Sequence, residues 1–473
     1  LEPHAVGCYS VCGHLKRNMR AAELELIDCE KLIKRYSPST KAKKYFQHLN
    51  TQWETICFNQ FHDILPGSAI REAIDVANMQ IGGVRDNVAR ITHDVLRGDS
   101  GISARCEIEG QRLHLVNRID SEWEGIADCE IWMDWMAWNH HLEDEKGRKI
   151  NCQIIPPSYL EFDEKGNPRC SPPRILFKID IPSGKSISLK IAEGDSQPDS
   201  PCCTFSGDKL SNGKVEVCFN QWGISDIYHS ARGRGWSVLE TPLAFECYAD
   251  QSDTWGHSVE TLGGPSIGAI KFEKPLLVYE GGLRTMVCLN GIIGNSKARL
   301  FVWLNKDEEA VHMRLDISYA EPLSLLKAIL APHFGIKSRF DRVCGGWIER
   351  EGDGKEYALH HAVCFNSRLL GDMGLLLPDT FALDGTRVSI RPTLIRNNVN
   401  AYNQWTPYDW SGNQRMKEKF GSDEGPTSIR MSFVIGEKAR RERMEKLLNC
   451  TMRPPYIWDD FRGKMARLKG FDS

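Results

Sequence analysis

The sequence has little net charge, no long apolar run and no leader-like opening. Its 473 residues carry a formal net charge of −3, which does not suit a surface that follows nucleic-acid phosphates. No apolar run approaches the roughly 20 residues that a membrane-spanning helix needs, and no signal-peptide pattern opens the chain. We therefore expect neither nucleic acid nor a membrane as a partner. The opening Leu1-Glu2 in place of Met suggests a vector remnant or a truncated start.

Sixteen cysteines are present, yet the chain has no CxxC pair of the kind that zinc clusters and thiol redox enzymes use. One close pair exists, Cys202-Cys203. Most of the others stand in apolar patterns, such as Cys29, Cys57, Cys106 and Cys218. We interpret them as buried free thiols, which favours a reducing compartment, and therefore a cytoplasmic protein.

Three apolar stripes with the period of an α-helix occupy the first hundred residues. They run from Leu15 to Tyr36, from Ala42 to Cys57 and from Ile70 to Val95. Steps of three and four residues place each stripe on one helix face, so the pattern predicts three amphipathic helices packed as a bundle.

Proline and glycine mark the limits of these helices. Ser37-Pro38 is expected to end the first helix, and Pro66-Gly67 the second. Ser68 is the expected N-cap of the third helix, and Gly82-Gly83 is expected to interrupt or bend it. Near the end of the chain, the charged segment 437–448 predicts a surface helix.

After Gly98 the apolar residues no longer recur with the period of a helix but at every second position. Residues alternate in this way at 187–191, 311–317, 388–390 and 429–433. Such alternation predicts half-buried antiparallel strands, and many short ones indicate sandwiches. The segment Gly194 to Gly213 is the expected linker between two β domains. We thus predict an α+β multidomain chain: a three-helix bundle at 1–98, a small β-sandwich domain at 99–198 and a large β-sandwich domain at 199–473.

One segment presents several polar groups at the end of the second helix. Asn59, Gln60, His62 and Asp63 stand together before the Pro66-Gly67 turn. A histidine beside a carboxylate at a helix end can bind a metal or orient a substrate hydroxyl. It can equally be structural, with Asp63 capping nearby amides and His62 satisfied against the core. The residues by themselves leave both interpretations open.

The run from Asn59 to Ser68 resembles the signature of the middle domain of glycoside hydrolase family 38 α-mannosidases. The segment from His4 to Ser10 is similar to the opening of the same domain. Asp253 to His257 and Glu280 to Arg284 resemble the large β domain of the family. The resemblance is strong over the first hundred residues and extends more loosely along the rest of the chain.

The resemblance implies a four-ligand zinc site in which His62 is one ligand, with Asp63 binding hydroxyls of the mannose to be cleaved. It also implies a retaining mechanism, with an aspartate nucleophile and a carboxylic acid that protonates the leaving oxygen. The family's other zinc ligands include a His-x-Asp pair in an N-terminal α/β barrel, and this sequence contains no His-x-Asp. The adjacent pairs His140-His141 and His360-His361 are expected to have surface or packing roles.

We therefore expect this chain to be the C-terminal part of an α-mannosidase, with no catalytic residue of its own. A mannoside or oligosaccharide would be its substrate and the missing barrel its partner, and a homo-oligomer is possible. One imidazole holds Zn²⁺ weakly, so the chain alone is expected to be inactive.

The alternative is a non-catalytic carbohydrate-binding or scaffolding protein that uses the β-sandwich surface. Two aromatic groups would suit that function, although packing or a plain surface loop explains each of them as well. One is the Trp132, Trp135 and Trp138 cluster, and the other is the segment from Asn400 to Gly412.

Overall fold

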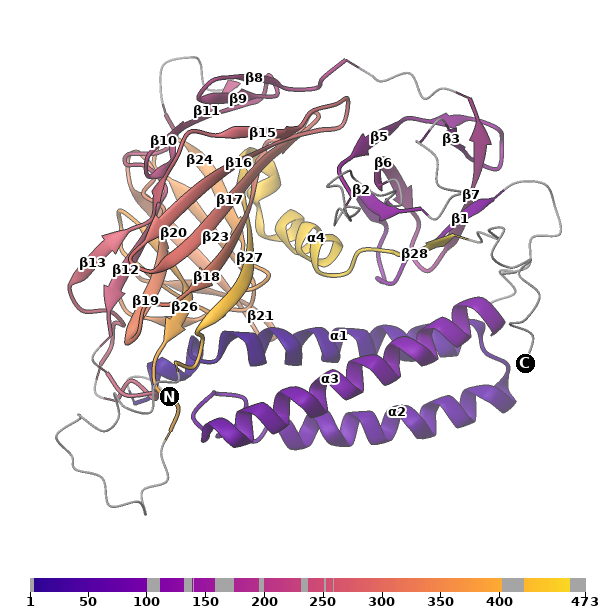
Figure 1. The fold of residues 1–473 in the computed structure, drawn as a ribbon, viewed down its shortest axis with the longest axis horizontal. Helices are drawn as coiled ribbons and strands as arrows, with labels where there is room; N and C mark the ends of the chain where they lie inside the picture. The colour runs from indigo at the N-terminus through magenta and orange to yellow at the C-terminus, as the bar shows by residue number, and fades with distance from the viewer. Residues whose placement is uncertain are drawn as a thin grey trace, which may run out of the picture.

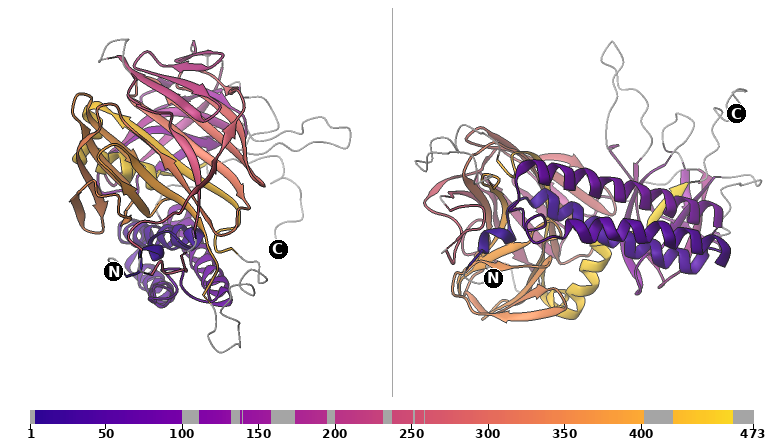
Figure 2. Two further views of the ribbon diagram at one scale, coloured as in Figure 1. Left: turned by 90° about the vertical axis from the view of Figure 1, so that its left-hand side faces the viewer. Right: turned by 90° about the horizontal axis from the view of Figure 1, so that it is seen from below.

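The computed structural model describes residues 4–99, 111–131, 138, 140–157, 174–194, 200–230, 237–250, 252–257, 259–401 and 421–459. It has a helical bundle below and two β domains above it, a large one at the left and a small one at the right of Figure 1. The three long helices lie side by side when the molecule is seen from below (Figure 2). The predicted α+β multidomain architecture, a three-helix bundle followed by antiparallel sheets, is confirmed.

The bundle consists of three long helices preceded by one short 3-10 turn. These are η1 (Val6–Tyr9), α1 (Gly13–Tyr36), α2 (Ser39–Asn59) and α3 (Arg71–Asp94), and a π turn, η2 (Val95–Asp99), follows α3. The predicted stripes form one core, in which Leu15, Leu26, Ile56, Ile81 and Val88 are buried. α1 ends directly before Ser37-Pro38, as the sequence predicts, because proline disfavours helical backbone in the residue before it.

Four expectations for the bundle were wrong. α2 ends at Asn59, before its expected end at Pro66-Gly67. α3 begins at Arg71 with Ile70 in the N-cap position, so Ser68 does not cap it. α3 also continues through Gly82 and Gly83 as one helix. Cys57 is exposed, because its position on α2 falls just outside the buried stripe, whereas Cys29 is buried as expected.

The small β domain contains two sheets. The five-stranded sheet has the order β28-β1-β7-β3-β4, and the three-stranded sheet has the order β2-β6-β5. Their bounds are β1 (Arg112–Val116), β2 (Trp123–Glu130), β3 (His140–Glu143), β4 (Lys149–Ile150), β5 (Cys152–Ile155), β6 (Arg174–Ile181), β7 (Ser186–Glu193) and β28 (Tyr456–Asp459). Side chains such as Leu115, Trp138, Phe177 and Leu189 form the core between them. Trp138 therefore packs in the core, and Trp132 and Trp135 lie outside the described residues.

The large β domain is built on a ten-stranded sheet packed against a six-stranded sheet, with a four-stranded sheet beside them. The ten strands are β14 (Lys271–Phe272), β15 (Leu276–Tyr279), β16 (Arg284–Ile293), β17 (Ser296–Asn305), β18 (Ala310–Tyr319), β20 (Ile336–Val343), β21 (Gly346–Arg350), β23 (Ala362–Ser367), β24 (Gly371–Leu376) and β27 (Gly425–Ile435). The six are β12 (Ala244–Ala249), β13 (Ser266–Ala269), β19 (Ser324–Ile329), β22 (Tyr357–Ala358), β25 (Ala382–Gly385) and β26 (Ile390–Asn397). The four are β8 (Thr204–Ser206), β9 (Lys209–Ser211), β10 (Val215–Asn220) and β11 (Gly223–His229).

The period-two alternation at 311–317 lies within β18, where Val311, Met313 and Leu315 point into the core while His312 and Arg314 face outward. The expected linker at 194–213 is wrong in part, because β8 and β9 lie inside it. Short strands rich in Ser, Thr and Gly resemble a linker in composition, and it is their pairing with β10 that makes them part of a sheet.

The C-terminal segment crosses from the large β domain to the small one. It forms η4 (Gly436–Ala439) and α4 (Arg441–Met452), which lies between the two β domains in Figure 1. Met444 and Leu448 of α4 are buried, so the predicted surface helix packs one face against the large domain. β28 then pairs with β1. The expected domain boundaries stay predictions, but this pairing puts the end of the described chain in the small domain's sheet.

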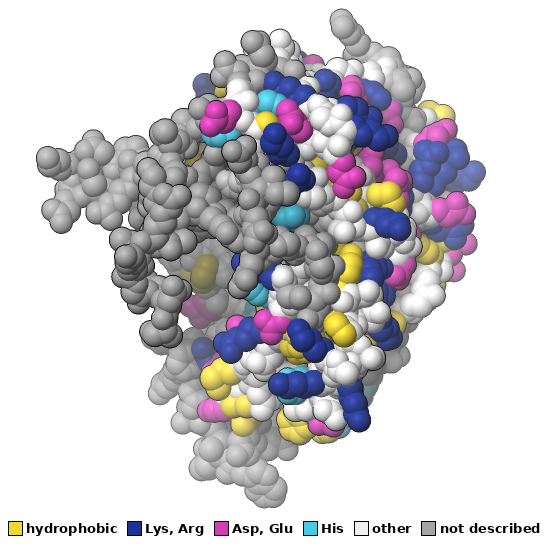
Figure 3. Space-filling model, turned by 90° about the vertical axis from the view of Figure 1, so that its right-hand side faces the viewer, with side chains coloured by type: hydrophobic (Ala, Val, Ile, Leu, Met, Phe, Trp, Pro, Cys, Tyr) yellow, Lys and Arg dark blue, Asp and Glu magenta, His cyan; other side chains and the backbone are white. Residues whose placement is uncertain are grey.

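The surface carries both signs of charge. On the described part of the face in Figure 3, basic and acidic side chains are interspersed, in keeping with the small net charge of the chain. None of the described helices is long and apolar enough to cross a membrane.

Candidate functional site

The signature segment forms a compact turn between α2 and α3, at the end of the bundle where the N-terminus lies (Figure 1). Backbone hydrogen bonds close it, from the Ile64 amide to the Phe61 carbonyl (2.9 Å) and from the Ser68 amide to the Asp63 carbonyl (3.0 Å). Gly67 has a φ of +81°, and a Cβ there would lie 2.7 Å from Cys12 Cβ. Only glycine fits this backbone conformation so close to the first helix.

His62 and Asp63 project from this turn toward solvent. Their side chains are 78% and 47% exposed, and His62 Nε2 lies 3.6 Å from Asp63 Oδ2. The Asp63 carboxylate accepts a hydrogen bond from Ser68 Oγ (3.4 Å), and α3 has no side-chain cap. The packing alternative for His62 and the capping alternative for Asp63 therefore do not describe this structure.

The other polar residues of the signature are structural. Asn59 is buried and its amide nitrogen donates to Gln80 Oε1 (2.8 Å), which joins α2 to α3. Gln60 donates to Glu23 Oε1 (2.8 Å) on α1. The turn is thus attached to both neighbouring helices, while His62 and Asp63 are left outside.

A buried lysine supports the turn from below. Lys16 on α1 donates from Nζ to the carbonyl oxygens of Val11 (2.5 Å) and Pro66 (2.9 Å). Burial lowers the pKa of this ammonium. The Cys12 thiol also contacts the Gly67 carbonyl (3.6 Å). The contact of Lys16 with Pro66, 50 residues away, could not be predicted from the sequence.

The large β domain meets the bundle at the same end. Asp423 accepts from the Gly13 amide (3.1 Å) and pairs with His14 (3.4 Å). Burial raises the pKa of Asp423, but the His14 hydrogen bond and the charges of His14 and Arg17 outweigh it, so the pKa is lowered. Asp423 is therefore a buried anion that fixes the start of α1.

A second loop of the large domain borders the N-terminal segment. The Gly7 amide donates to the Trp255 carbonyl (2.8 Å), and His257 Nδ1 lies 2.6 Å from Asp253 Oδ2. Burial raises the pKa of the Cys8 thiol, and the charges of Asp253 and Asp63 add to this. Both carboxylates are therefore within electrostatic reach of Cys8. The structure brings the family-like segments 4–10, 59–68 and 253–257 to one end of the molecule.

The loop is held in place by a buried ion pair. Arg396 donates from Nε to Asp250 Oδ2 (2.7 Å) and from Nη1 to the Thr254 carbonyl (2.7 Å). Both charged side chains are buried. The loop from Asp250 to His257 is thus fixed by a partner on β26, in the same way that Lys16 fixes the 59–68 turn.

The available His, Cys, Asp and Glu side chains decide whether this chain could hold the zinc ion that the resemblance implies. No group of three or more His, Cys, Asp or Glu side chains is arranged to hold a metal within the part of the chain that the structure describes. His62 offers an exposed imidazole beside a carboxylate, which fits one ligand of a shared site and not a complete one. The pairs His140-His141 and His360-His361 lie away from the signature turn. His360 is partly buried and His361 is buried.

An exposed apolar patch surrounds the signature turn. Its members all come from the end of α2, the turn and the start of α3: Phe58, Phe61, Ile70, Val76 and Met79. Phe58 and Met79 are 67% and 70% exposed. We call these five residues the bundle-end patch. Contiguous exposed apolar surface is a common feature of binding sites for other proteins.

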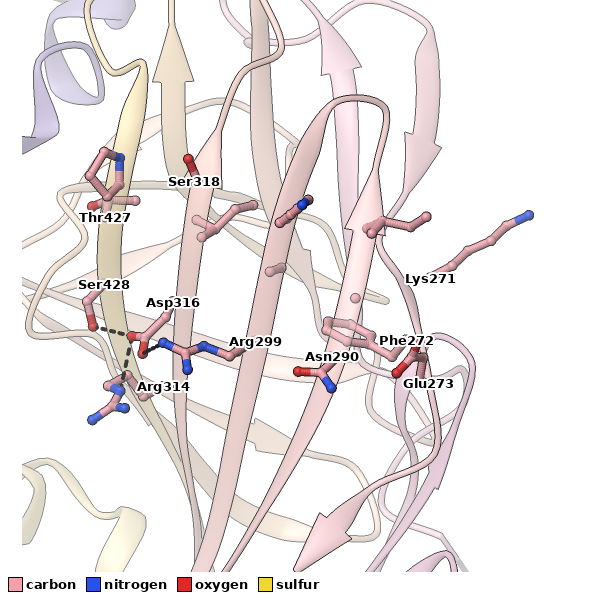
Figure 4. Close-up of a pocket in the computed structure, with 16 residues that line it drawn as sticks. Lys271, Phe272, Glu273, Asn290, Arg299, Arg314, Asp316, Ser318, Thr427 and Ser428 are labelled. Carbon is pink, nitrogen blue, oxygen red and sulfur yellow. Dashed lines mark hydrogen bonds and ion pairs between the residues drawn. The ribbon is translucent and has the colours of Figure 1, made fainter. Parts of the chain in front are cut away.

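A groove of about 1090 Å³ lies on the outer face of the ten-stranded sheet. Figure 4 shows Asp316 at its floor, with Ser428 and two arginines around it. Ser428 donates to Asp316 Oδ1 (2.7 Å), Arg314 Nε lies 3.0 Å from the same atom, and Arg299 approaches Oδ2 at 4.0 Å. The segment from Asn400 to Gly412, the expected cleft loop, lies outside the described residues from 402 onward.

The helical part of this chain is similar to a known family domain. Residues 4–98 match the family model of the alpha mannosidase middle domain. This match contains the whole signature and confirms the resemblance to glycoside hydrolase family 38. No curated protein matches the chain.

Two solved structures from Enterococcus faecalis share the fold. One is a protein of glycosyl hydrolase family 38, with 11% identity and a TM-score of 0.72. The other is an alpha-mannosidase of strain V583, with 11% identity and a TM-score of 0.73. The match covers 97% of this chain in both cases, but 61% and 58% of those chains. The chain therefore has the fold of about three fifths of each of these proteins.

Proposed function

We propose that this chain is the C-terminal part of a retaining, zinc-dependent α-mannosidase, to which it supplies His62 and Asp63. The observation that carries the proposal is the exposed His62–Asp63 pair on a rigidly held turn inside the matched middle domain. An exposed imidazole and a half-exposed carboxylate held outward are suited to act on a ligand from outside the bundle.

In this proposal each residue has one task. His62 would provide one imidazole ligand to Zn²⁺, which when bound acts as a Lewis acid toward sugar hydroxyls. Asp63 would accept hydrogen bonds from the mannose hydroxyls and so orient the ring. The nucleophile and the acid that protonates the leaving oxygen would come from an N-terminal α/β barrel. Lys16 and Gly67 act through the turn and are positioning residues.

The bundle-end patch supports the barrel as a partner. Phe61 lies against His62, with ring centroids 4.1 Å apart, so a body that covers Phe61 would bring its own ligands to the imidazole. Each large apolar side chain removed from water contributes roughly 1.5–3 kcal/mol. We expect Phe58→Ser and Met79→Ser to leave this chain folded and to weaken its association with the barrel.

The test uses the protein that contains both the barrel and this chain. Zinc content and hydrolysis of a chromogenic α-mannoside are measured for the wild type, for His62→Ala and for His48→Ala. His48 is an exposed histidine on α2, the helix that leads into the turn of His62, which makes it a matched control. We expect His62→Ala to lose zinc and at least about 100-fold in kcat/KM, since even outer partners of a metal are worth 10–100-fold. Full activity and zinc in His62→Ala would contradict the proposal.

The groove around Asp316 favours a second candidate function, non-catalytic binding of a carbohydrate. Carboxylates, guanidinium groups, amides and hydroxyls that face one groove can all hydrogen-bond sugar hydroxyls. Two variants distinguish the candidate functions in a binding assay with a mannose oligosaccharide. Binding that is lost in Asp316→Ala and kept in His62→Ala would favour the groove, and the reverse pattern would favour the signature turn.

A further inference from the structure

Two adjacent cysteines stand where the two β domains meet. Cys202 and Cys203 directly precede β8, and their Sγ atoms lie 3.5 Å apart. The Cys202 amide donates to the Gly281 carbonyl (2.8 Å), and the Cys203 thiol contacts the Leu304 carbonyl (3.6 Å). Backbone contacts on both sides therefore hold the two sulfur atoms in contact with each other.

The two thiols are unequal. Cys203 is only 4% exposed, whereas Cys202 is partly accessible. The hydrogen bond between the two sulfur atoms lowers the pKa of Cys202, burial opposes this, and the Lys306 charge lowers the pKa further. The same hydrogen bond raises the pKa of Cys203, and burial adds to this. Of the two thiols, Cys202 therefore has the lower pKa and the greater exposure.

The pair is connected to a contact between the domains. A Cβ at Gly281 would lie 2.4 Å from Gln153 Cδ, so β5 of the small domain packs against the residue that Cys202 binds. The Gln153 side chain accepts from the amides of Leu283 (2.9 Å) and Arg284 (2.8 Å) and donates to the Arg284 carbonyl (2.8 Å). A change at Cys202 therefore reaches the junction of the small and large β domains through Gly281.

We propose that Cys202-Cys203 is a site of reversible oxidation by a peroxide, with Cys202 as the reacting thiol and Cys203 as the resolving one. This goes beyond the proposed glycosidase function and does not depend on it. A partly accessible thiol 3.5 Å from a second thiol is the arrangement found in redox-sensing cysteines. The site takes hydrogen peroxide or a small organic hydroperoxide.

The reaction balances in two steps. The Cys202 thiolate attacks one peroxide oxygen, the O–O bond breaks, and hydroxide leaves and is protonated to water, which gives a sulfenic acid on Cys202. The Cys203 sulfur then attacks the Cys202 sulfur and forms the disulfide, and its proton leaves with the sulfenic hydroxyl as a second water. One peroxide is reduced and two thiols are oxidised.

The covalent geometry makes the product easy to reduce. Neighbouring Cα atoms are about 3.8 Å apart across a trans peptide. Disulfides usually join Cα atoms about 4.4–6.8 Å apart, so a bond between adjacent residues is strained. Strained disulfides have more oxidising potentials and are readily reopened by thiols. The modification is therefore reversible by a dithiol reductant.

The sequence allows a direct test. Trypsin cleavage after Lys190 and Lys209 releases one peptide, 191–209, in which Cys202 and Cys203 are the only cysteines. The full protein is treated with hydrogen peroxide, blocked with an alkylating reagent and digested without reduction. We expect this peptide to be lighter by two hydrogens and unalkylated, and to return to the doubly alkylated form after dithiothreitol. A peptide that stays doubly alkylated while the exposed Cys57 and Cys344 are oxidised would overturn the proposal.

Two variants test the separate roles. In Cys203→Ser we expect Cys202 to stop at the sulfenic acid, which a dimedone-type probe captures. In Cys202→Ser we expect Cys203 to react at least about tenfold more slowly than Cys202 does, because it is protonated and buried. Equal trapping of both variants would contradict the assignment. Cys288→Ser, a change of a partly exposed cysteine on β16, is the matched control and should leave the disulfide yield unchanged.

A structural readout accompanies the chemical one. Closing the ring changes the backbone at Cys202, so the hydrogen bond from its amide to Gly281 is expected to weaken. Amide hydrogen exchange at Leu283 and Arg284 should then become faster in the oxidised protein and return after reduction. Unchanged exchange at both amides would show that the oxidation is not transmitted to the contact with Gln153.

Discussion

Arg118 donates from Nε to Asp28 Oδ2 at 2.6 Å, and this bond connects the small β domain to the helical bundle. Asp28 lies on α1 and is fully buried. Its other oxygen pairs with Arg453, which follows α4 and stands 425 residues away in the chain. The Arg118 guanidinium also stacks over Tyr456 of β28, 4.4 Å from the ring centre. One carboxylate thus joins three parts of the fold.

Removal of this carboxylate is expected to be strongly destabilising. Asp28→Ala leaves two arginines without a partner in a water-poor site, and breaking a buried pair in this way costs about 3–5 kcal/mol. Glu25→Ala is the control, because Glu25, also on α1, pairs with Arg85 of α3 and both side chains are partly exposed. Such exposed pairs contribute about 0–1 kcal/mol. Urea unfolding measures both variants, and a similar loss in the two would contradict the role of Asp28.

Two glycine substitutions are expected to change the free energy of unfolding in opposite directions. Gly67→Ala places a Cβ 2.7 Å from Cys12 Cβ at a φ of +81°, so the variant should lose about 1–3 kcal/mol. Gly82→Ala lies in the middle of α3, where an added Cβ meets nothing within 4 Å. It should gain roughly 0.5–1 kcal/mol from helix propensity. Thermal or urea unfolding measures the stability of both variants, and a stabilised Gly67→Ala would show that the turn is not constrained as described.

The Lys16 ammonium is expected to act on the signature turn. Lys16→Met keeps the packing of the aliphatic stem and removes both hydrogen bonds, leaving the Val11 and Pro66 carbonyls without their donor. We expect a loss of about 1–3 kcal/mol. In the protein that includes the barrel, we also expect zinc affinity to fall because the His62 turn moves. Lys34→Met, at an exposed position of the same helix, is the control for both measurements. Unchanged zinc affinity in a folded Lys16→Met would remove Lys16 from the positioning role.

Stability should fall in mild acid because of two neighbouring histidines. Burial, together with the charges of Arg20 and Arg342, lowers the pKa of His360 to about 4. Burial and the neighbouring His360 lower that of His361 to about 2. Below their ordinary value of 6.5, the unfolded chain takes up protons that the folded chain does not bind. The free energy of unfolding therefore decreases as the pH falls from about 6.5 toward 4, by at most about 1.4 kcal/mol per pH unit for each histidine.

The variant His361→Asn tests this pH dependence. Asparagine is the best replacement, because His361 has a φ of +74° and asparagine tolerates that left-handed backbone. Urea unfolding at pH 7 and pH 5 should show a smaller loss in His361→Asn than in the wild type. His48→Asn, on the exposed face of α2, should behave as the wild type does. Identical pH slopes in all three proteins would mean that His361 is not buried in its neutral form.

The sequence predicts the parts of the fold that depend on local pattern. The stripes from Leu15 to Tyr36 and from Ile70 to Val95 identify α1 and α3 because each helix buries one face. Alternation at 311–317 identifies β18 for the same reason. The Ser68 cap failed because the turn binds this residue to Asp63, and its hydroxyl contacts that residue and not the first amides of α3.

Contacts between distant residues could not be predicted. Nothing in the local pattern pairs Tyr456 with Val116, or Lys16 with Pro66. The candidate site likewise combines features that the sequence predicts with features that depend on contacts between distant residues. His62 and Asp63 stand out in the sequence by their resemblance to a family signature, but their exposure and the bundle-end patch around them depend on how α1, α2 and α3 pack.

The pairing of β1 with β28 affects how the chain can be made. β1 is synthesised well before β28, so until β28 is made one side of β1 has no strand beside it. An unpaired strand edge is a template for pairing with other chains. A nascent or prematurely terminated polypeptide that lacks Tyr456–Asp459 would expose this edge permanently. Nonsense mutations far downstream of the signature turn should therefore yield aggregation-prone products, although every residue of the helical bundle is present in them.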